Sequence, residues 1–257
     1  MPLAAKSNWC FRWMKTLDQI QCVQSETELN QVLDQLSAPH RPETLAFVNA
    51  HAMNCVAAME DFGSALWNAN MVVRDGSGMS ILLKVLKRAP GLNLNGTDLI
   101  PRIISRYNGR SIALLGTCEP HLSKAADKVR QTLAPHSELL VLDGFQNNAS
   151  YLDYVREHRP VLVVLGMGMP KQEQVAVMLR DGLEHPCLIV CGGAIIDFLG
   201  GRVARAPLWA RNLGVEWLFR LLLEPRRLFE RYVLGNPLFL MRSMYFKWGR
   251  GRWSGST

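Results

Sequence analysis

The amino-acid sequence predicts an α/β fold in which helices cover both faces of a parallel sheet. Six short apolar runs recur along the chain, a helical pattern follows each run, and the runs are continuous rather than alternating. A strand covered by helices on both faces is apolar throughout, whereas a strand with one wet face alternates. The chain of 257 residues, 48% of them hydrophobic, is long enough for one such domain, with or without an appendage.

The predicted strands and helices follow one another in regular pairs. We expect strands at residues 44–49, 71–76, 111–116, 138–144, 160–166 and 186–193. We expect the helices that follow them at residues 52–67, 81–86, 119–133, 149–158, 171–183 and 194–199. This order indicates a Rossmann-like, doubly wound parallel sheet.

The pattern changes after residue 204. Residues 1–204 carry 19 Lys/Arg and 19 Asp/Glu, whereas residues 205–257 carry 10 Lys/Arg against three Glu, together with four tryptophans. Helices are predicted at 208–223 and 226–246, with Pro225 and Pro237 suited to helix starts. We therefore divide the chain into a Rossmann-like domain, 1–204, and a basic, amphipathic helical appendage, 205–257. The charge of the appendage indicates an anionic partner: a membrane, a nucleic acid or a phosphate.

Cysteine usage and hydropathy favour a cytoplasmic protein without a membrane span. The six cysteines include no CxxC pair, so we interpret them as small buried hydrophobic residues of a reducing compartment, rather than as a disulfide or zinc set. No uninterrupted apolar stretch reaches the ~18 residues that a spanning helix needs. Cations flank the short aromatic run near the N-terminus, which makes a poor signal peptide.

Common cofactor and metal motifs are missing from the sequence. It contains no P-loop, no clean GxGxxG after a strand, no HExxH and no DxD carboxylate pair. NAD binding is therefore weakly indicated, and a metal centre lacks recognisable ligands. We expect no metal and no cofactor.

Glycine and aspartate recur where the predicted strands end. Asp75-Gly76, Gly116, Asp143-Gly144, Gly166 and Gly192-Gly193 hold such positions. Ligands of open α/β sheets bind beyond the carboxyl ends of the strands, where glycine lets backbone N–H groups approach an anion. These residues therefore predict a nucleotide or phosphate site, although any one glycine can equally serve a tight turn.

Two polar residues at predicted helix starts have alternative interpretations. Asp75, in RDGSG, either caps the following helix with its carboxylate or faces a ligand. Lys171, in LGMGMPKQEQ, lies at the positive end of a predicted helix, which is slightly unfavourable for a cation. Its position predicts a nearby anion such as a diphosphate, and an ordinary solvent-exposed lysine is the alternative.

The order of several motifs resembles one family of enzymes. RDGSG, GMGMPKQE and GGAIIDFLGG are followed by RAP, EWLFRL, EPRR and GNPLF. Over roughly residues 45–240 this combination is similar to the WecG/TagA/CpsF family of glycosyltransferases. The resemblance implies an inverting, metal-independent enzyme that moves a sugar from a UDP-sugar donor to a polyprenyl-diphosphate-linked sugar acceptor. It also implies peripheral association with the inner face of the cell membrane.

The resemblance also assigns roles to residues of this chain. Asp75 matches the general base, and Asn49 matches the asparagine after the first strand. The residues expected on the donor or nucleotide side are Gly116, Phe145, Gly166, Lys171, Gln172, Glu173, Gly192, Gly193 and Asp197. Phe145 lies where the family has an aromatic near the uracil, and a place in the core is its alternative.

Arginines of the appendage are expected to neutralise the leaving diphosphate in the absence of a metal. The best candidates are Arg220, Arg226 and Arg227, and the next candidates are Arg205 and Arg231. The appendage would also dock on anionic lipid through its basic charge and its tryptophans.

The identity of the sugar depends on one departure from the family pattern. Phe47 stands where the family has a threonine, which favours a branch with another sugar. We therefore expect transfer of glucose from UDP-glucose onto glucosyl-diphosphate-lipid, giving a β-1,4 disaccharide in xanthan-type exopolysaccharide biosynthesis. N-acetylmannosaminyl transfer onto lipid-linked N-acetylglucosamine is the alternative.

Two other classes of protein fit the sequence less well. A nucleic-acid binder lacks a recognisable motif, and its basic residues would not alternate with leucines as they do here. An NAD-dependent dehydrogenase lacks the dinucleotide fingerprint. We expect no nucleic-acid partner. A homo-oligomer is the alternative to a monomer.

Overall fold

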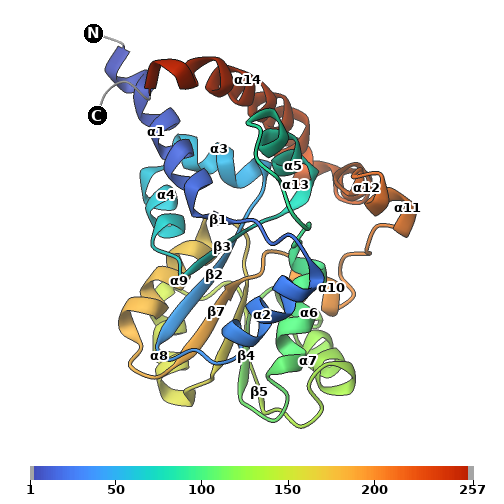
Figure 1. The fold of residues 1–257 in the computed structure, drawn as a ribbon. Helices are drawn as coiled ribbons and strands as arrows, with labels where there is room; N and C mark the ends of the chain where they lie inside the picture. The colour runs from blue at the N-terminus through green and yellow to red at the C-terminus, as the bar shows by residue number, and fades with distance from the viewer. Residues whose placement is uncertain (1–2, 254–257) are drawn as a thin grey trace.

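A computed structural model describes residues 3–253, and it is built on a seven-stranded, all-parallel sheet (Figure 1). The spatial order of the strands is β1-β3-β2-β7-β6-β4-β5. Their bounds are Ile20–Gln21 (β1), Pro42–Val48 (β2), Met71–Arg74 (β3), Ile112–Gly116 (β4), Leu139–Leu142 (β5), Leu162–Gly166 (β6) and Cys187–Cys191 (β7). The predicted α/β, Rossmann-like sheet is therefore confirmed, and each of the six predicted strands is present.

Helices cover both faces of the sheet, as the continuous apolar runs predict. The helices before residue 200 are Leu3–Gln19 (α1), Glu26–Leu36 (α2), Ala50–Ala58 (α3), Glu60–Trp67 (α4), Gly76–Val85 (α5), Gly96–Arg106 (α6), His121–Thr132 (α7), Asn148–His158 (α8), Lys171–Gly182 (α9) and Ile195–Leu199 (α10). Within β4, Ile112 and Leu114 pack with α2, α6, α7 and α10. Ala113 and Leu115 point the other way and pack with α8 and α9.

Several element boundaries differ from those predicted. The strands at 71–76, 138–144 and 186–193 end earlier, so Asp75, Gly144 and Gly193 lie in the turns beyond them. The single helix predicted at 52–67 is two helices, because Met59 between α3 and α4 is extended, with φ −126°. The helix predicted at 81–86 already begins at Gly76. Helices α1, α2 and α6 were not predicted.

The C-terminal segment is divided more finely than predicted. It contains Leu208–Asn212 (α11), Glu216–Leu223 (α12), Pro225–Phe229 (α13), a π-helical turn at Glu230–Leu234 (η1) and Gly235–Trp253 (α14). Pro225 occupies the first turn of α13, as its sequence position predicts. No helix within residues 3–253 combines the length and the apolar character that crossing a bilayer requires.

Helix α14 lies along α1 and α3, at the top of the molecule in Figure 1. Its Phe239 and Phe246 are buried against Trp13 of α1, with ring centroids 5.7 and 5.8 Å away. Asn54 of α3 donates to the Gly235 carbonyl at 2.7 Å. The described part of the C-terminal segment is therefore fastened to the N-terminal part along α14, and the division at residue 204 stays a prediction.

Candidate active site

A cavity of about 1250 Å³ lies at the carboxyl ends of the strands. Turns after β2, β3, β4, β5, β6 and β7 form one wall, the strand-end wall, and the C-terminal segment forms the other, the C-terminal wall. The predicted site residues that line it are Asn49, Asp75, Phe145, Gly166, Gln172, Gly192, Gly193, Asp197, Arg220, Arg227 and Arg231. The predicted site residues that do not line it are Gly116, Lys171, Glu173, Arg205 and Arg226.

Asp75 faces the cavity instead of capping a helix. It occupies the position before α5, but its carboxylate makes no capping hydrogen bond. Its Oδ2 instead accepts a hydrogen bond of 3.2 Å from Asn49 Nδ2. The Asn49 Oδ1 accepts from the Ala52 N–H and so caps α3, which fixes the orientation of the amide. Asn49, which follows β2, therefore holds in place the carboxylate of Asp75, which follows β3.

The surroundings of Asp75 favour a carboxyl group that binds a proton more readily than usual. Loss of hydration raises the pKa of Asp75, while the Asn49 hydrogen bond and the charges of Arg231, Arg220 and Arg74 oppose the rise. Arg74 is itself buried, and its guanidinium group is already hydrogen-bonded, since it donates to the carbonyls of Pro90 and Gly91 at 2.7 and 2.8 Å. A carboxylate with a raised pKa and one cavity-facing side is suited to accept a proton from a bound hydroxyl.

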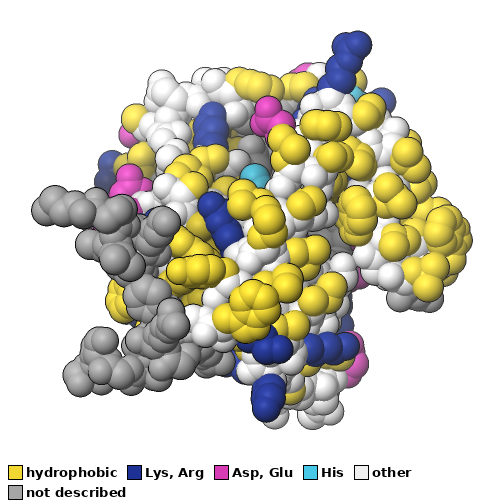
Figure 2. Space-filling model, turned by 90° about the horizontal axis from the view of Figure 1, so that it is seen from above, with side chains coloured by type: hydrophobic (Ala, Val, Ile, Leu, Met, Phe, Trp, Pro, Cys, Tyr) yellow, Lys and Arg dark blue, Asp and Glu magenta, His cyan; other side chains and the backbone are white. Residues whose placement is uncertain are grey.

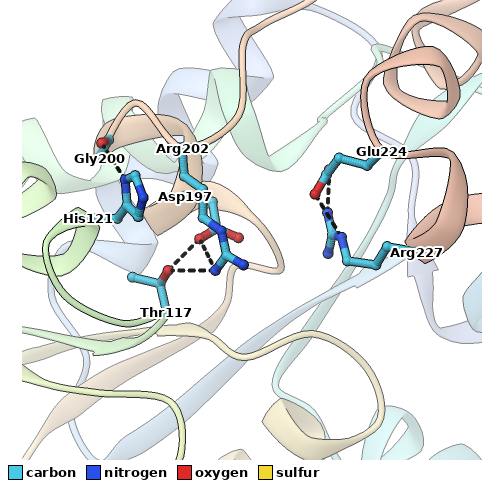
Figure 3. Close-up of polar contacts among 7 residues, drawn as sticks. All are labelled: Thr117, His121, Asp197, Gly200, Arg202, Glu224 and Arg227. Carbon is cyan, nitrogen blue, oxygen red and sulfur yellow. Dashed lines mark hydrogen bonds and ion pairs between the residues drawn. The ribbon is translucent and has the colours of Figure 1, made fainter.

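A second polar cluster joins β4 to α10 (Figure 3). Thr117 Oγ1 donates to Asp197 Oδ1 at 2.5 Å, and Arg202 Nη1 lies 3.5 Å from the same oxygen. Thr117 has a positive φ of 47°, which is uncommon for a residue with a branched side chain. All three residues line the cavity. Thr117 and Arg202 were not predicted, and only Asp197 belongs to a recognisable motif.

Lys171 and Phe145 have different surroundings from each other. Lys171 Nζ donates to the Gly144 and Gln146 carbonyls at 2.8 and 2.9 Å, so it fastens the loop after β5 rather than facing the cavity. The prediction of an anion beside Lys171 lacks support, because these two carbonyls and the Tyr151 hydroxyl, at 3.5 Å, occupy the three N–H groups of the ammonium. Phe145, on that same loop, is 77% exposed, which excludes the core alternative and leaves its ring free at the cavity.

The predicted arginines fall into two groups. Within the described residues, Arg220 and Arg231 form no ion pair, and the Nε atom of each is buried without a hydrogen-bond partner. Arg227 instead makes a two-point contact with Glu224, at 2.8 and 2.5 Å (Figure 3). Arg205 pairs with Asp98 of α6 outside the cavity. Arg220 and Arg231 are thus cations on the cavity wall that lack a counter-ion of their own.

Two further titratable residues of the cavity escaped prediction. Burial, and then the charge of Arg231, lowers the pKa of His51 to about 4, so the imidazole is neutral near pH 7. Burial, and then the charge of Asp75, raises the pKa of Glu216. Ser77 Oγ donates to the Gly214 carbonyl at 3.1 Å, which brings the turn before α12 beside the start of α5. The sequence could have indicated both residues by their positions near motifs. His51 follows Asn49 by two residues, and Glu216 begins the EWLFRL motif.

Residues 3–253 bring together no group of three His, Cys, Asp or Glu side chains that could hold a metal ion. The carboxylates that line the cavity are Asp75, Asp197 and Glu216, and several guanidinium groups line it with them. Such a set is suited to bind hydroxyl groups and anions.

Comparison with known proteins gives the chain a family. Residues 16–253 match the profile of the glycosyl transferase WecG/TagA/CpsF family. Two similar curated proteins are each an N-acetylglucosaminyldiphosphoundecaprenol N-acetyl-beta-D-mannosaminyltransferase, from Staphylococcus aureus strains NCTC 8325 / PS 47 and MRSA252. They are 24% identical over 184 residues and 25% identical over 190 residues, and each match covers 70% of this chain and 72% of the relative. Since the family profile spans nearly all of the described residues, the chain belongs to the WecG/TagA/CpsF family of glycosyltransferases.

Proposed function

We propose that the protein is an inverting glycosyltransferase that moves a sugar from a UDP-sugar onto a polyprenyl-diphosphate-linked sugar. Family membership supports the reaction class. The single observation that carries the site assignment is that Asn49 holds the carboxylate of Asp75 toward the same cavity that Arg220 and Arg231 line. A base and uncompensated cations in one cavity are what a displacement with an anionic leaving group requires.

The proposed step is a single displacement at the anomeric carbon. The acceptor hydroxyl attacks C1 of the donor sugar and loses its proton to Asp75. The bond between C1 and the β-phosphate oxygen breaks, and both of its electrons leave with UDP. Arg220 and Arg231 neutralise the charge that develops on the diphosphate, and Arg227 joins them when the anion displaces Glu224. We propose that these guanidinium groups serve in place of a divalent ion.

The part of the strand-end wall that contains Phe145, Gly166, the Gly192–Gly193 turn, Asp197 and Arg202 is proposed to bind the nucleotide, and we call it the donor-side wall. Phe145 offers an exposed ring for stacking on the uracil base, while Asp197 and Arg202 present hydrogen-bonding groups to the same cavity. Gly166 leaves no room for a side chain, since a Cβ there would lie 2.7 Å from Ile196. Glycine at this position therefore lets α10 pack closely against the end of β6.

The relatives favour N-acetylmannosamine as the transferred sugar and lipid-linked N-acetylglucosamine as the acceptor. Both curated relatives carry that activity in their names, so we propose it here ahead of glucosyl transfer. One observation keeps glucose as the second candidate. Phe47 lines the cavity although it is only 4% exposed, and it cannot offer the hydroxyl of the family's threonine to an N-acetyl group or a sugar.

We further propose that the C-terminal segment docks the enzyme on the inner face of the cell membrane. Figure 2 shows hydrophobic side chains gathered with Lys and Arg on the side of the molecule where α14 lies. The exposed apolar side chains of the segment include Leu208, Trp209, Leu213, Leu222, Phe229, Leu234, Met241, Met244 and Trp248. Basic and aromatic residues on an apolar surface suit an anionic lipid interface. A lipid carrier could then reach the cavity without leaving the bilayer.

The test is a donor screen read by mass spectrometry. Purified protein is incubated with UDP-N-acetylmannosamine or UDP-glucose, and with N-acetylglucosaminyl- or glucosyl-diphosphate-lipid. We expect a disaccharide-lipid from the first donor with the first acceptor, formed in the presence of a chelator. A product from UDP-glucose alone would make glucosyl transfer the function. The absence of product from every combination would overturn the proposal.

A further inference from the structure

Gln172 is the second residue of α9, and its side-chain amide forms hydrogen bonds with other groups of the protein. The side chain is fully buried although the residue borders the cavity. Its Nε2 donates to Glu173 Oε1 at 2.8 Å and to the Cys191 carbonyl at 3.4 Å, while its Oε1 accepts from the Gly193 N–H at 2.9 Å. Both N–H groups of the amide are therefore occupied, and Gln172 has no donor left for a ligand.

The group that Gln172 holds is a tight turn between β7 and α10. Gly193 has a φ of +62°, and a Cβ on Gly192 would lie 2.6 Å from Ile195 Cγ2. The turn lines the cavity, and α10 begins at Ile195, just beyond the turn, and carries Asp197 as its third residue. A displacement of the turn would therefore move the backbone of the donor-side wall together with Asp197.

Glu173 lies behind Gln172 and does not line this cavity. It is 2% exposed, its Oε1 accepts the Gln172 hydrogen bond, and its Oε2 is buried without a partner. Burial raises the pKa of Glu173 to about 7, against the opposing effects of Gln172 and Arg231. Protonation at the free Oε2 would leave the Oε1 acceptor in place, so both forms can hold the amide.

A carboxyl group at this position decides which way the amide points. Were the Gln172 amide turned over, its oxygen would face the Glu173 oxygen and its NH₂ group would face the Gly193 N–H. Two acceptors would then oppose each other, and so would two donors, all of them buried. With an apolar residue in place of Glu173, the turned-over amide would no longer meet an opposing acceptor. Only the unfavourable contact with the Gly193 N–H would then disfavour that orientation.

We propose that Glu173 is a positioning residue, which orients the Gln172 amide and thereby fixes the Gly192–Gly193 turn and the start of α10. It contributes to the donor-side wall without touching the donor. The importance of this wall for UDP rests on the proposed function, whereas the fixing of the turn does not.

Three variants and one control test this inference. Glu173→Met keeps the length of the side chain and removes the acceptor, Glu173→Asp keeps the acid but shortens its reach, and Glu173→Gln keeps an acceptor at Oε1. The control is Gln174→Ala, at the exposed neighbouring position. Two quantities are measured: hydrogen–deuterium exchange of the 192–199 peptide, and the Kd for UDP by calorimetry.

We expect the Met and Asp variants to exchange the 192–199 peptide about tenfold faster and to bind UDP about tenfold more weakly, because a buried donor loses its partner. We expect Glu173→Gln to stay close to wild type in both measurements. Exchange in the Met and Asp variants equal to that of Gln174→Ala, or a Gln variant as impaired as the Met variant, would overturn the inference. If the Met variant fails to fold, the comparison of the Asp and Gln variants decides it. Wild-type protein that does not bind UDP would count against the proposed function, while the exchange data would still decide the role of Glu173.

Discussion

The two walls of the cavity differ in how their polar groups are satisfied. On the strand-end wall the polar side chains bind groups of that same wall: Asn49 donates to Asp75, Thr117 donates to Asp197, and Gln172 accepts from the Gly193 N–H. On the C-terminal wall, Arg211, Arg220 and Arg231 each have a buried Nε without a partner. The first wall is thus organised before any ligand arrives, whereas the second presents positive charge that a ligand would complete. A catalytic base needs fixed geometry, and a site for a departing anion needs uncompensated charge.

The largest effect is expected from the strand-end wall. Asp75→Ala removes the proposed base, and kcat should fall by roughly 10²–10⁴-fold, the usual contribution of general-base catalysis. The affinity for UDP should change little, because the carboxylate is assigned to the acceptor side. Steady-state kinetics and calorimetry on one preparation measure both quantities. A variant with wild-type kcat would remove Asp75 from the mechanism.

The C-terminal wall should respond through the nucleotide instead. Arg220→Ala and Arg231→Ala remove charges that face the cavity, and each should lower kcat/KM by about 10–100-fold, since charge-assisted hydrogen bonds to the diphosphate are lost. UDP affinity should fall as well, unlike the result for Asp75→Ala. Arg226→Ala is the matched comparison, because Arg226 is an exposed arginine of the same segment that does not line the cavity. Equal losses in all three variants would mean that the segment acts through its total charge alone.

A smaller effect is expected at the exposed side of the same segment. Leu222 and Trp248 are 73% and 75% exposed, so serine at both positions should leave the melting temperature nearly unchanged. Binding to anionic vesicles should weaken by about tenfold, because exposed apolar area is lost from the docking surface. Cosedimentation measures the binding, and neutral vesicles provide the reference. Unchanged binding would place the membrane contact elsewhere.

The smallest effect is expected on the pH dependence of stability. The folded-state pKa of Asp75 lies above its unfolded value, so the ionised form is the less favourable one in the fold. The stability that the protonated group contributes is present in full below about pH 4 and is lost as the pH rises through the folded pKa. Asp75→Asn should therefore raise the melting temperature by a few degrees at pH 8 and by nothing at pH 3. A melting temperature that falls at pH 8 would show that Asp75 is stabilised in its ionised form.

Most of the strand-end wall could be predicted from the sequence. Asp75, Gly166 and Gly192 were found because a buried parallel strand is a continuous apolar run, and ligands bind where such runs end. Thr117 was missed because an ordinary threonine after a strand carries no signal, and its positive φ is visible only in the structure. Lys171 and Glu173 were predicted at the donor site from the family motif, and Lys171 also from its place at a helix start, yet the first turn of α9 directs both side chains away from the cavity.

The C-terminal wall was predicted from the charge of the segment and from the family resemblance, which ranked Arg226 and Arg227 above Arg231. The excess of arginine after residue 204 indicated an anionic ligand, but it did not distinguish Arg220 and Arg231 from Arg205 and Arg226. Helical periodicity could not separate them, since the segment divides into α11, α12, α13 and η1. Glu216 was likewise missed, because its proximity to Asp75 depends on the contact between Ser77 and Gly214.

The sequence by itself determined the parallel sheet, the edge at which its ligand site lies, the family and the sign of the charge that surrounds the site. Local apolar runs, strand-end glycines and composition carry that information, since each depends on neighbours along the chain. Only the tertiary structure decided which arginines lack a counter-ion, which carboxylates share the cavity, and that Glu173 acts through Gln172. Those properties depend on contacts between segments far apart in the chain, and residue spacing does not encode them.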